Sequence, residues 1–155
     1  SWCISTDPEF AQKAADIAAK AGVINANNRW CSVDWITMQS TANPYIHVLG
    51  DATMPAPAMP KSGAMANQHA KVCAAGVVAL MTGQPISQSP VMTNTCYSFV
   101  SDKEAVHVAS VHTYDAKDKT LKPVPGAGGL SSAATEVEGT YGWLWAQNIW
   151  ADMLG

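Results

Sequence analysis

The sequence predicts an α+β fold in which helix-rich chain precedes a small antiparallel sheet and a long C-terminal helix. Three observations support this prediction. Residues 62–81 are rich in alanine and have a helical pattern, residues 95–124 change to short segments rich in β-branched side chains, and residues 135–154 are helical again. With 155 residues, the chain is long enough for one domain, or two small ones, with a real core.

Composition excludes two classes of function. The net charge is −3 without a Lys/Arg cluster, which argues against a nucleic-acid partner. The longest apolar stretch, near residues 72–81, is much shorter than the roughly 20 residues that span a bilayer, so no membrane span is expected. Only 14% of residues are charged, against about 25% in typical domains, so we expect a partner, a ligand or further chain to cover much of the surface.

The N-terminal third predicts one helix and two strands. Residues 1–10, "SWCISTDPEF", match nothing that follows and are interpreted as a possible vector-derived segment, with native sequence as the alternative. A helix is expected over 11–21, with Ile17 on its apolar side. Strands are expected over 32–40 and, as a buried strand, over 45–50, where His47 is interpreted as a satisfied core histidine.

The central and C-terminal elements follow from their caps and breakers. Prolines exclude a regular element over 52–60. A helix then runs from an N-cap at Ser62 to a stop at Gly83, and its small or apolar residues on nearly all sides predict burial. The remaining expectations are a linker over 83–94, strands over 96–100, 104–115 and 120–124 that form an antiparallel meander, a loop over 125–132, and a helix over 135–154 with Trp143 and Trp150 on one face.

Cysteine and histidine positions predict no metal site. Cys3, Cys31, Cys73 and Cys96 have the spacing of neither a zinc site nor a C-x-x-C motif, so buried thiols are the plain interpretation. The four histidines, at positions 47, 69, 107 and 112, have no ligand spacing either.

Gly50–Asp51 is the main candidate for a ligand site. A strand ending there would place a carboxylate at the carboxyl end of a sheet, where ligands of α/β folds bind, and Gly50 would allow close approach of the backbone. The hydroxyls of a sugar or ribitol would supply donors to Asp51, and the helix starting at Ser62 would direct free N–H groups at the same place. The alternative is an ordinary strand-to-turn junction.

The stretch "TANPYIHVLGD", with Thr41 ten residues before Asp51, resembles the second flavin-binding motif of flavoproteins with two dinucleotide-binding domains. Together with "AMPKSGAMANQHAKVCAAGVVALMTGQP", "NTCYSFV" and "YGWLWAQNIWADMLG", it resembles the flavoprotein subunit of flavocytochrome c sulfide dehydrogenase over residues 11–155. The resemblance implies that residues 11–88 are the remnant of an α/β FAD-binding domain (strand, Gly-Asp, long helix). Residues 89–155 would be the C-terminal flavin-binding domain of that family.

The resemblance also implies roles for particular residues. Cys96 would form a redox-active disulfide above the flavin, with a partner in an N-terminal part of the flavoprotein that is missing here; a buried thiol is the alternative. Trp145 would pack near the flavin or be a core residue, and Lys61 would face the flavin or cap its loop. Cys31 is interpreted as structural. The implied FAD-binding residues are Gly50, Asp51, Ala52, Met59, Pro60, Lys61, Ser62 and Trp145.

The function that the resemblance implies is oxidation of sulfide through this disulfide and FAD, with electrons passed to a c-type cytochrome subunit in the periplasm. The fragment alone is expected to be inactive. One alternative is a sulfide:quinone or NADH-type flavoprotein disulfide oxidoreductase, although the C-terminal helix lacks the basic face of a membrane-docking surface. The other is a catalytically silent module that binds a cytochrome or another subunit.

Overall fold

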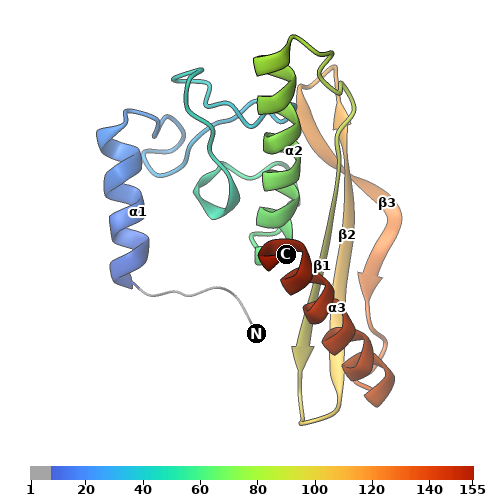
Figure 1. The fold of residues 1–155 in the computed structure, drawn as a ribbon. Helices are drawn as coiled ribbons and strands as arrows, with labels where there is room; N and C mark the ends of the chain where they lie inside the picture. The colour runs from blue at the N-terminus through green and yellow to red at the C-terminus, as the bar shows by residue number, and fades with distance from the viewer. Residues whose placement is uncertain (1–7) are drawn as a thin grey trace.

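The computed structural model describes residues 8–155 and confirms an α+β fold (Figure 1). Residues 1–7, and with them Cys3 and most of the suspected foreign segment, lie outside the described residues. In chain order the elements are α1 (Pro8–Lys20), the 3-10 helix η1 (Gly50–Ala52), α2 (Gly63–Thr82), β1 (Val91–Phe99), β2 (Ala105–Asp115), β3 (Thr120–Leu130) and α3 (Glu136–Leu154).

The three strands form the predicted antiparallel meander in the order β1-β2-β3. Two boundaries were wrong. β1 begins at Val91, inside the expected linker, and β3 continues to Leu130 through the expected loop. The glycines that suggested a loop instead permit close approach: a Cβ on Gly128, at φ +132°, would lie 2.3 Å from the Ala109 carbonyl oxygen of β2.

The two strands expected over 32–40 and 45–50 do not form. Isolated bridges replace them, Val33 with Ser40 and Gln39 with His47, and Met38 adopts a left-handed conformation (φ 61°) that interrupts any ladder. The apolar side chains of this segment pack into the core instead. The core cluster comprises Val33, Trp35, Met38, Ala56, Met59, Met65, Met92 and Leu121. On α1, Ile17 is 69% exposed, so its expected apolar side is not covered.

Helix α2 begins and ends as predicted, but it is not buried on all sides. The Ser62 hydroxyl accepts a hydrogen bond from the Met65 N–H at 3.0 Å, and Gly83 ends the helix in the left-handed conformation. One face packs on the core through Met65, whereas Val78, Leu80 and Met81 are exposed. No other segment of residues 8–155 buries these apolar side chains of α2.

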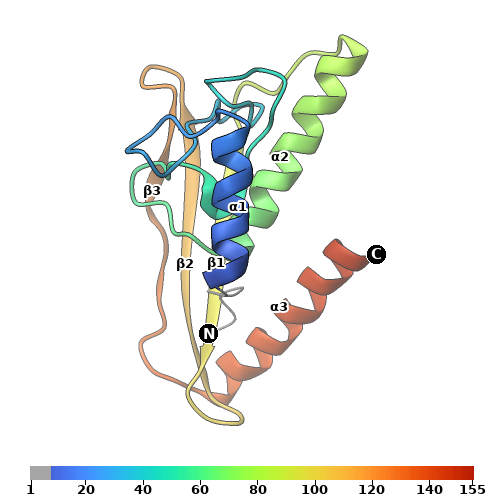
Figure 2. The same cartoon turned by 90° about the vertical axis from the view of Figure 1, so that its left-hand side faces the viewer.

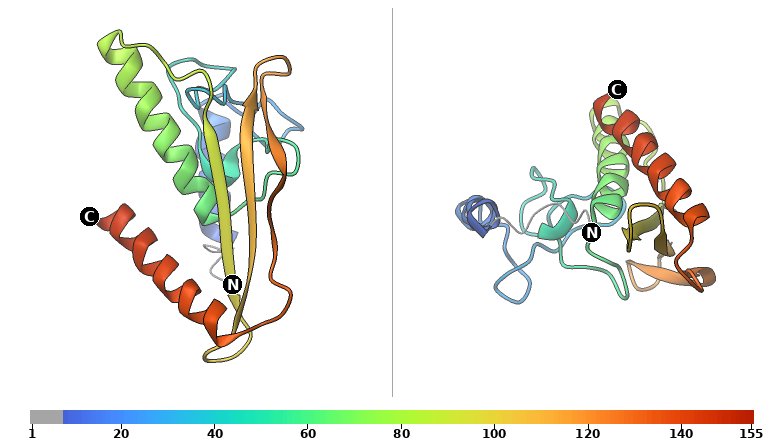
Figure 3. Two further views of the ribbon diagram at one scale, coloured as in Figure 1. Left: turned by 90° about the vertical axis from the view of Figure 1, so that its right-hand side faces the viewer. Right: turned by 90° about the horizontal axis from the view of Figure 1, so that it is seen from below.

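Helix α3 is attached near both of its ends. Figures 2 and 3 show it leaving the hairpin end of the sheet and running toward α2. Near its end, Asp152 accepts hydrogen bonds from Asn67 (3.1 Å) and from Lys71 (2.7 Å) of α2. Trp143 and Trp150 meet edge to face at 5.7 Å, which confirms their shared face. Within residues 8–155, no helix has the length and apolar character to cross a membrane.

Candidate functional site

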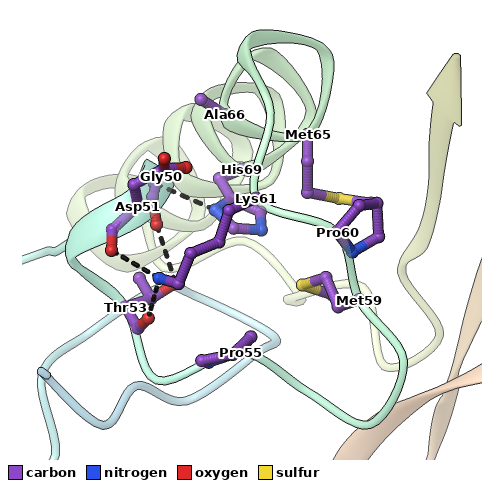
Figure 4. A pocket seen from close by; sticks show the side chains of 10 residues that line it. All are labelled: Gly50, Asp51, Thr53, Pro55, Met59, Pro60, Lys61, Met65, Ala66 and His69. Carbon is purple, nitrogen blue, oxygen red and sulfur yellow. Dashed lines mark hydrogen bonds between the residues drawn. The ribbon is translucent and has the colours of Figure 1, made fainter. Parts of the chain in front are cut away.

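Most of the predicted ligand-binding residues meet at the N-terminal end of α2 (Figure 4). The pocket there has a volume of about 10 Å³, room for roughly one water molecule, so a larger ligand would contact these residues from outside. Ala52 completes η1 beside the pocket, and Ser62 caps α2. The pocket is lined by Gly50, Asp51, Thr53, Pro55, Met59, Pro60, Lys61, Met65, Ala66 and His69.

The Gly50–Asp51 turn lies directly against α2. Gly50 has φ +64°, and a Cβ there would lie 3.3 Å from the Cβ of Ala66, so the turn requires glycine. Asp51 follows in η1 and not at the end of a buried strand, which corrects the sequence prediction. Its carboxylate is exposed. It can therefore accept hydrogen bonds from a ligand without first being desolvated by the protein.

Lys61 joins the proline loop to η1. Its ammonium donates to the carbonyl oxygens of Asp51 (2.5 Å) and Thr53 (3.0 Å), and it lies 3.8 Å from the ring centroid of Trp30. The pKa of Lys61 is lowered overall, and burial is the largest cause. The charge of Asp51 opposes this shift, and the charge of Arg29 adds to it. Of the two roles considered for Lys61, this geometry favours capping of the loop.

The buried side chain of His69, on α2, binds the backbone of the Gly50–Asp51 turn. Its Nδ1 accepts the Gly50 N–H at 3.0 Å, so the neutral ring carries its proton on Nε2, which is buried without a partner in the described chain. Its ring meets Trp35 edge to face at 5.5 Å. Burial, and secondly the charge of Lys61, lower the pKa of His69 to about 4. His69 is therefore a neutral positioning group for Gly50.

His47 differs from its predicted state. Its Nε2 is buried and also lacks a partner in the described chain, so the expectation of a satisfied core histidine was wrong. No group of three or more His, Cys, Asp or Glu side chains among residues 8–155 could hold a metal ion.

We expect acid to destabilise the fold through His69. Between pH 6.5 and about 4 the unfolded chain binds a proton at this residue that the folded chain excludes, so stability falls as pH falls through this window. The contribution between pH 7 and pH 5 is about 2 kcal/mol. Urea unfolding of the parent and His69→Gln at both pH values measures it. Burial also lowers the pKa of His112, but this residue is present in both proteins, so its contribution to the pH dependence cancels in the comparison. An equal loss of stability in the two proteins would contradict this role of His69.

Cys96 lies on β1 and is a partly buried free thiol. Its Sγ donates to Oδ1 of Asn94 at 3.6 Å, and the hydroxyl of Ser62 donates to the same oxygen. The strand thus brings the predicted redox cysteine to the N-cap of α2. Sequence reasoning missed Asn94, although its position two residues before Cys96 on a strand predicts that both side chains project from one face. Burial raises the pKa of the other free thiols, Cys31 and Cys73.

Trp145 is half-buried, and its ring contact is with Tyr97 at 5.9 Å. Tyr97 follows Cys96 on β1, so alternation along the strand directs the two side chains to opposite faces. The structure therefore places Trp145 against the neighbour of Cys96 in the chain, on the opposite face of the sheet from the Cys96 side chain. At the start of α3, His107 Nδ1 contacts both Glu138 (2.8 Å) and Ser131 (2.8 Å), and the hydrogen bond of His107 lowers the pKa of Glu138.

A turn with an exposed carboxylate, beside a helix N-terminus and a strand thiol, suits a ligand with hydroxyl groups and an end that becomes negative on reduction. These are properties of flavins. Residues 88–154 match the family model described as flavocytochrome c sulphide dehydrogenase, flavin-binding. The match confirms the predicted resemblance to the C-terminal portion of the flavoprotein over these residues and agrees with FAD as the cofactor. The match includes Cys96, Asn94 and Trp145, and the Gly50–Ser62 segment precedes it.

Proposed function

We propose that this chain is the C-terminal part of an FAD-dependent sulfide dehydrogenase, which oxidises sulfide through a disulfide of Cys96 and passes electrons to a c-type cytochrome subunit. The observation that carries the proposal is the shared acceptor of Cys96 and Ser62. Through Asn94, the sulfur of Cys96, for which we propose the redox role, lies beside the end of α2 that is next to the Gly50–Asp51 turn.

The residues at the end of α2 fit FAD. Gly50 has a positive φ and lies close to Ala66, Nε2 of His69 is a buried donor without a partner in residues 8–155, and Asp51 is exposed for the ribitol hydroxyls. When bound, FAD supplies a two-electron acceptor. We assign the remnant of the FAD-binding domain to residues 11–88 and the C-terminal flavin-binding domain to residues 89–155.

Cys96 supplies the sulfur chemistry. Hydrosulfide attacks one sulfur of a disulfide that includes Cys96, a new S–S bond forms as the old one breaks, and the products are a persulfide and a thiolate. A partly buried position limits competing reactions of this sulfur while it remains within reach of a small anion.

Exposed apolar side chains support the proposed partners. Val78 and Met81 on α2, and Trp143 and Trp150 on α3, are all exposed. Large aromatic residues on a surface favour a protein interface. We propose that the rest of the flavoprotein and the cytochrome subunit cover these faces, and that the assembly works in the periplasm, where a disulfide is stable.

The sulfide step can be tested without flavin. We expect the chain treated with an aromatic disulfide to carry a mixed disulfide on Cys96. Sulfide should then release the aromatic thiolate and leave one additional sulfur atom on Cys96. Mass spectrometry of the Cys96 peptide measures this, with the Cys73 peptide as the internal control. An unlabelled Cys96, or a mixed disulfide that sulfide does not displace, would contradict the proposal.

A further inference from the structure

Asn94 is a buried polar side chain that joins two elements. It is 2% exposed and lies on β1 between Met92 and Cys96, on the face that packs toward α2. Its Oδ1 accepts two hydrogen bonds, one from the hydroxyl of Ser62 and one from the thiol of Cys96. The Ser62 oxygen in turn accepts the Met65 N–H. An uninterrupted series of hydrogen bonds therefore runs from the backbone of α2 to the sulfur.

We propose that Asn94 is a positioning residue for Cys96 and that its amide oxygen fixes the sulfur at the N-cap of α2. The importance of this role rests on the function proposed above for Cys96. A carbonyl oxygen only accepts hydrogen bonds, so the thiol must be the donor in this contact. Ionisation of Cys96, or its oxidation to a disulfide, removes one of the two donors to Asn94.

The same oxygen makes the helix cap depend on the state of the sulfur. With Cys96 as a thiol, Oδ1 is shared between two donors; without the S–H, it is left with Ser62 alone. The hydrogen bond of Ser62 to Asn94 then has no competitor. The N-terminal turn of α2, which lies beside the proposed flavin-binding residues, thus responds to the chemistry of Cys96 through one amide group.

The S–H stretching band in the infrared spectrum tests the proposal directly. Comparison with Cys96→Ser identifies the band of Cys96 among those of the other thiols. We expect Asn94→Leu, which has a similar size and no acceptor, to move this band to higher wavenumber. Asn94→Asp, a charged acceptor, should move it to lower wavenumber because charge-assisted hydrogen bonds are stronger. Ser62→Ala removes the competing donor and should move the band to slightly lower wavenumber.

Alkylation of Cys96 gives a second, independent measurement. A carboxylate at position 94 repels the thiolate, so we expect Asn94→Asp to slow alkylation of Cys96 at neutral pH by about tenfold and to move its pH–rate profile to higher pH. Cys73, on α2, should react at the parent rate. Circular dichroism confirms that each variant is folded.

A purely structural role of Asn94 predicts a different result. In that case the Cys96 band would keep its wavenumber in Asn94→Leu, and alkylation in Asn94→Asp would stay within about twofold of the parent; either result overturns the proposal. Neither measurement needs sulfide or FAD. A failure of the proposed function would appear in the persulfide experiment and leave the S–H band shifts unchanged.

Discussion

Gly139→Ala should lower the melting temperature of the chain by roughly 6–12 °C, because overpacking at this site costs about 3 kcal/mol. A Cβ at Gly139 would lie 1.7 Å from the carbonyl oxygen of Lys103 in the β1–β2 turn. The obstacle is backbone, so no side chain can rotate away. The start of α3 must therefore move off the sheet. Thermal unfolding followed by circular dichroism measures the effect.

Thr140→Ala is the matched control because it changes the adjacent, exposed residue of the same helix. We expect a change of less than about 0.5 kcal/mol there. If α3 separates locally in Gly139→Ala before the whole chain unfolds, hydrogen exchange will show faster exchange of α3 amides alone. A variant with parent-like melting and parent-like protection of α3 would contradict the packing described here.

Asp51→Asn should weaken FAD binding by roughly tenfold to a hundredfold, because a hydrogen bond to a charged group contributes about 1.5–3 kcal/mol. The carboxylate is exposed in η1, so the substitution should leave the melting temperature unchanged. Titration of FAD, followed by its visible absorbance in the presence of the chain, gives the affinity. This measurement tests the flavin half of the proposed function separately from its sulfide half.

Asp102→Asn is the control for charge alone, since Asp102 is an exposed acid in the β1–β2 turn and lies outside the pocket-lining residues. It should bind FAD as the parent does. Equal affinities of the parent and Asp51→Asn would show that the Gly50–Asp51 turn does not hold the ribitol chain. Loss of binding in both variants would show only a general dependence on charge.

Sequence reasoning succeeded where structure is determined locally. Ser62 caps α2 through a hydroxyl that accepts the N–H group three residues later, and Gly83 ends α2 without a Cβ penalty. The strands predicted over 32–40 and 45–50 do not form, because a strand needs a partner strand of matching length. Here the chain offers single bridges, and its apolar side chains gain more by packing around Met38.

The site was predictable only in part for the same reason. Gly50, Asp51 and Lys61 are close in sequence, so their meeting at one pocket follows from a short loop. The contact of Ser62 with Asn94 joins residues 32 positions apart and depends on how β1 packs against α2. Likewise, the exposed face of α2 could not be foreseen from its composition, because burial depends on which chain covers a helix.

The two attachments of α3 respond to different solvent variables. Its start is fixed by the steric fit of Gly139 against the backbone, which dissolved ions do not alter. Its far end is held by the ion pair of Asp152 with Lys71, whose side chains are 37% and 54% exposed. Salt screens such a surface pair within a few ångströms to about 10 Å. Raising the ionic strength should therefore loosen the far end of α3, where the Asn67 hydrogen bond to Asp152 remains, and leave its start unaffected.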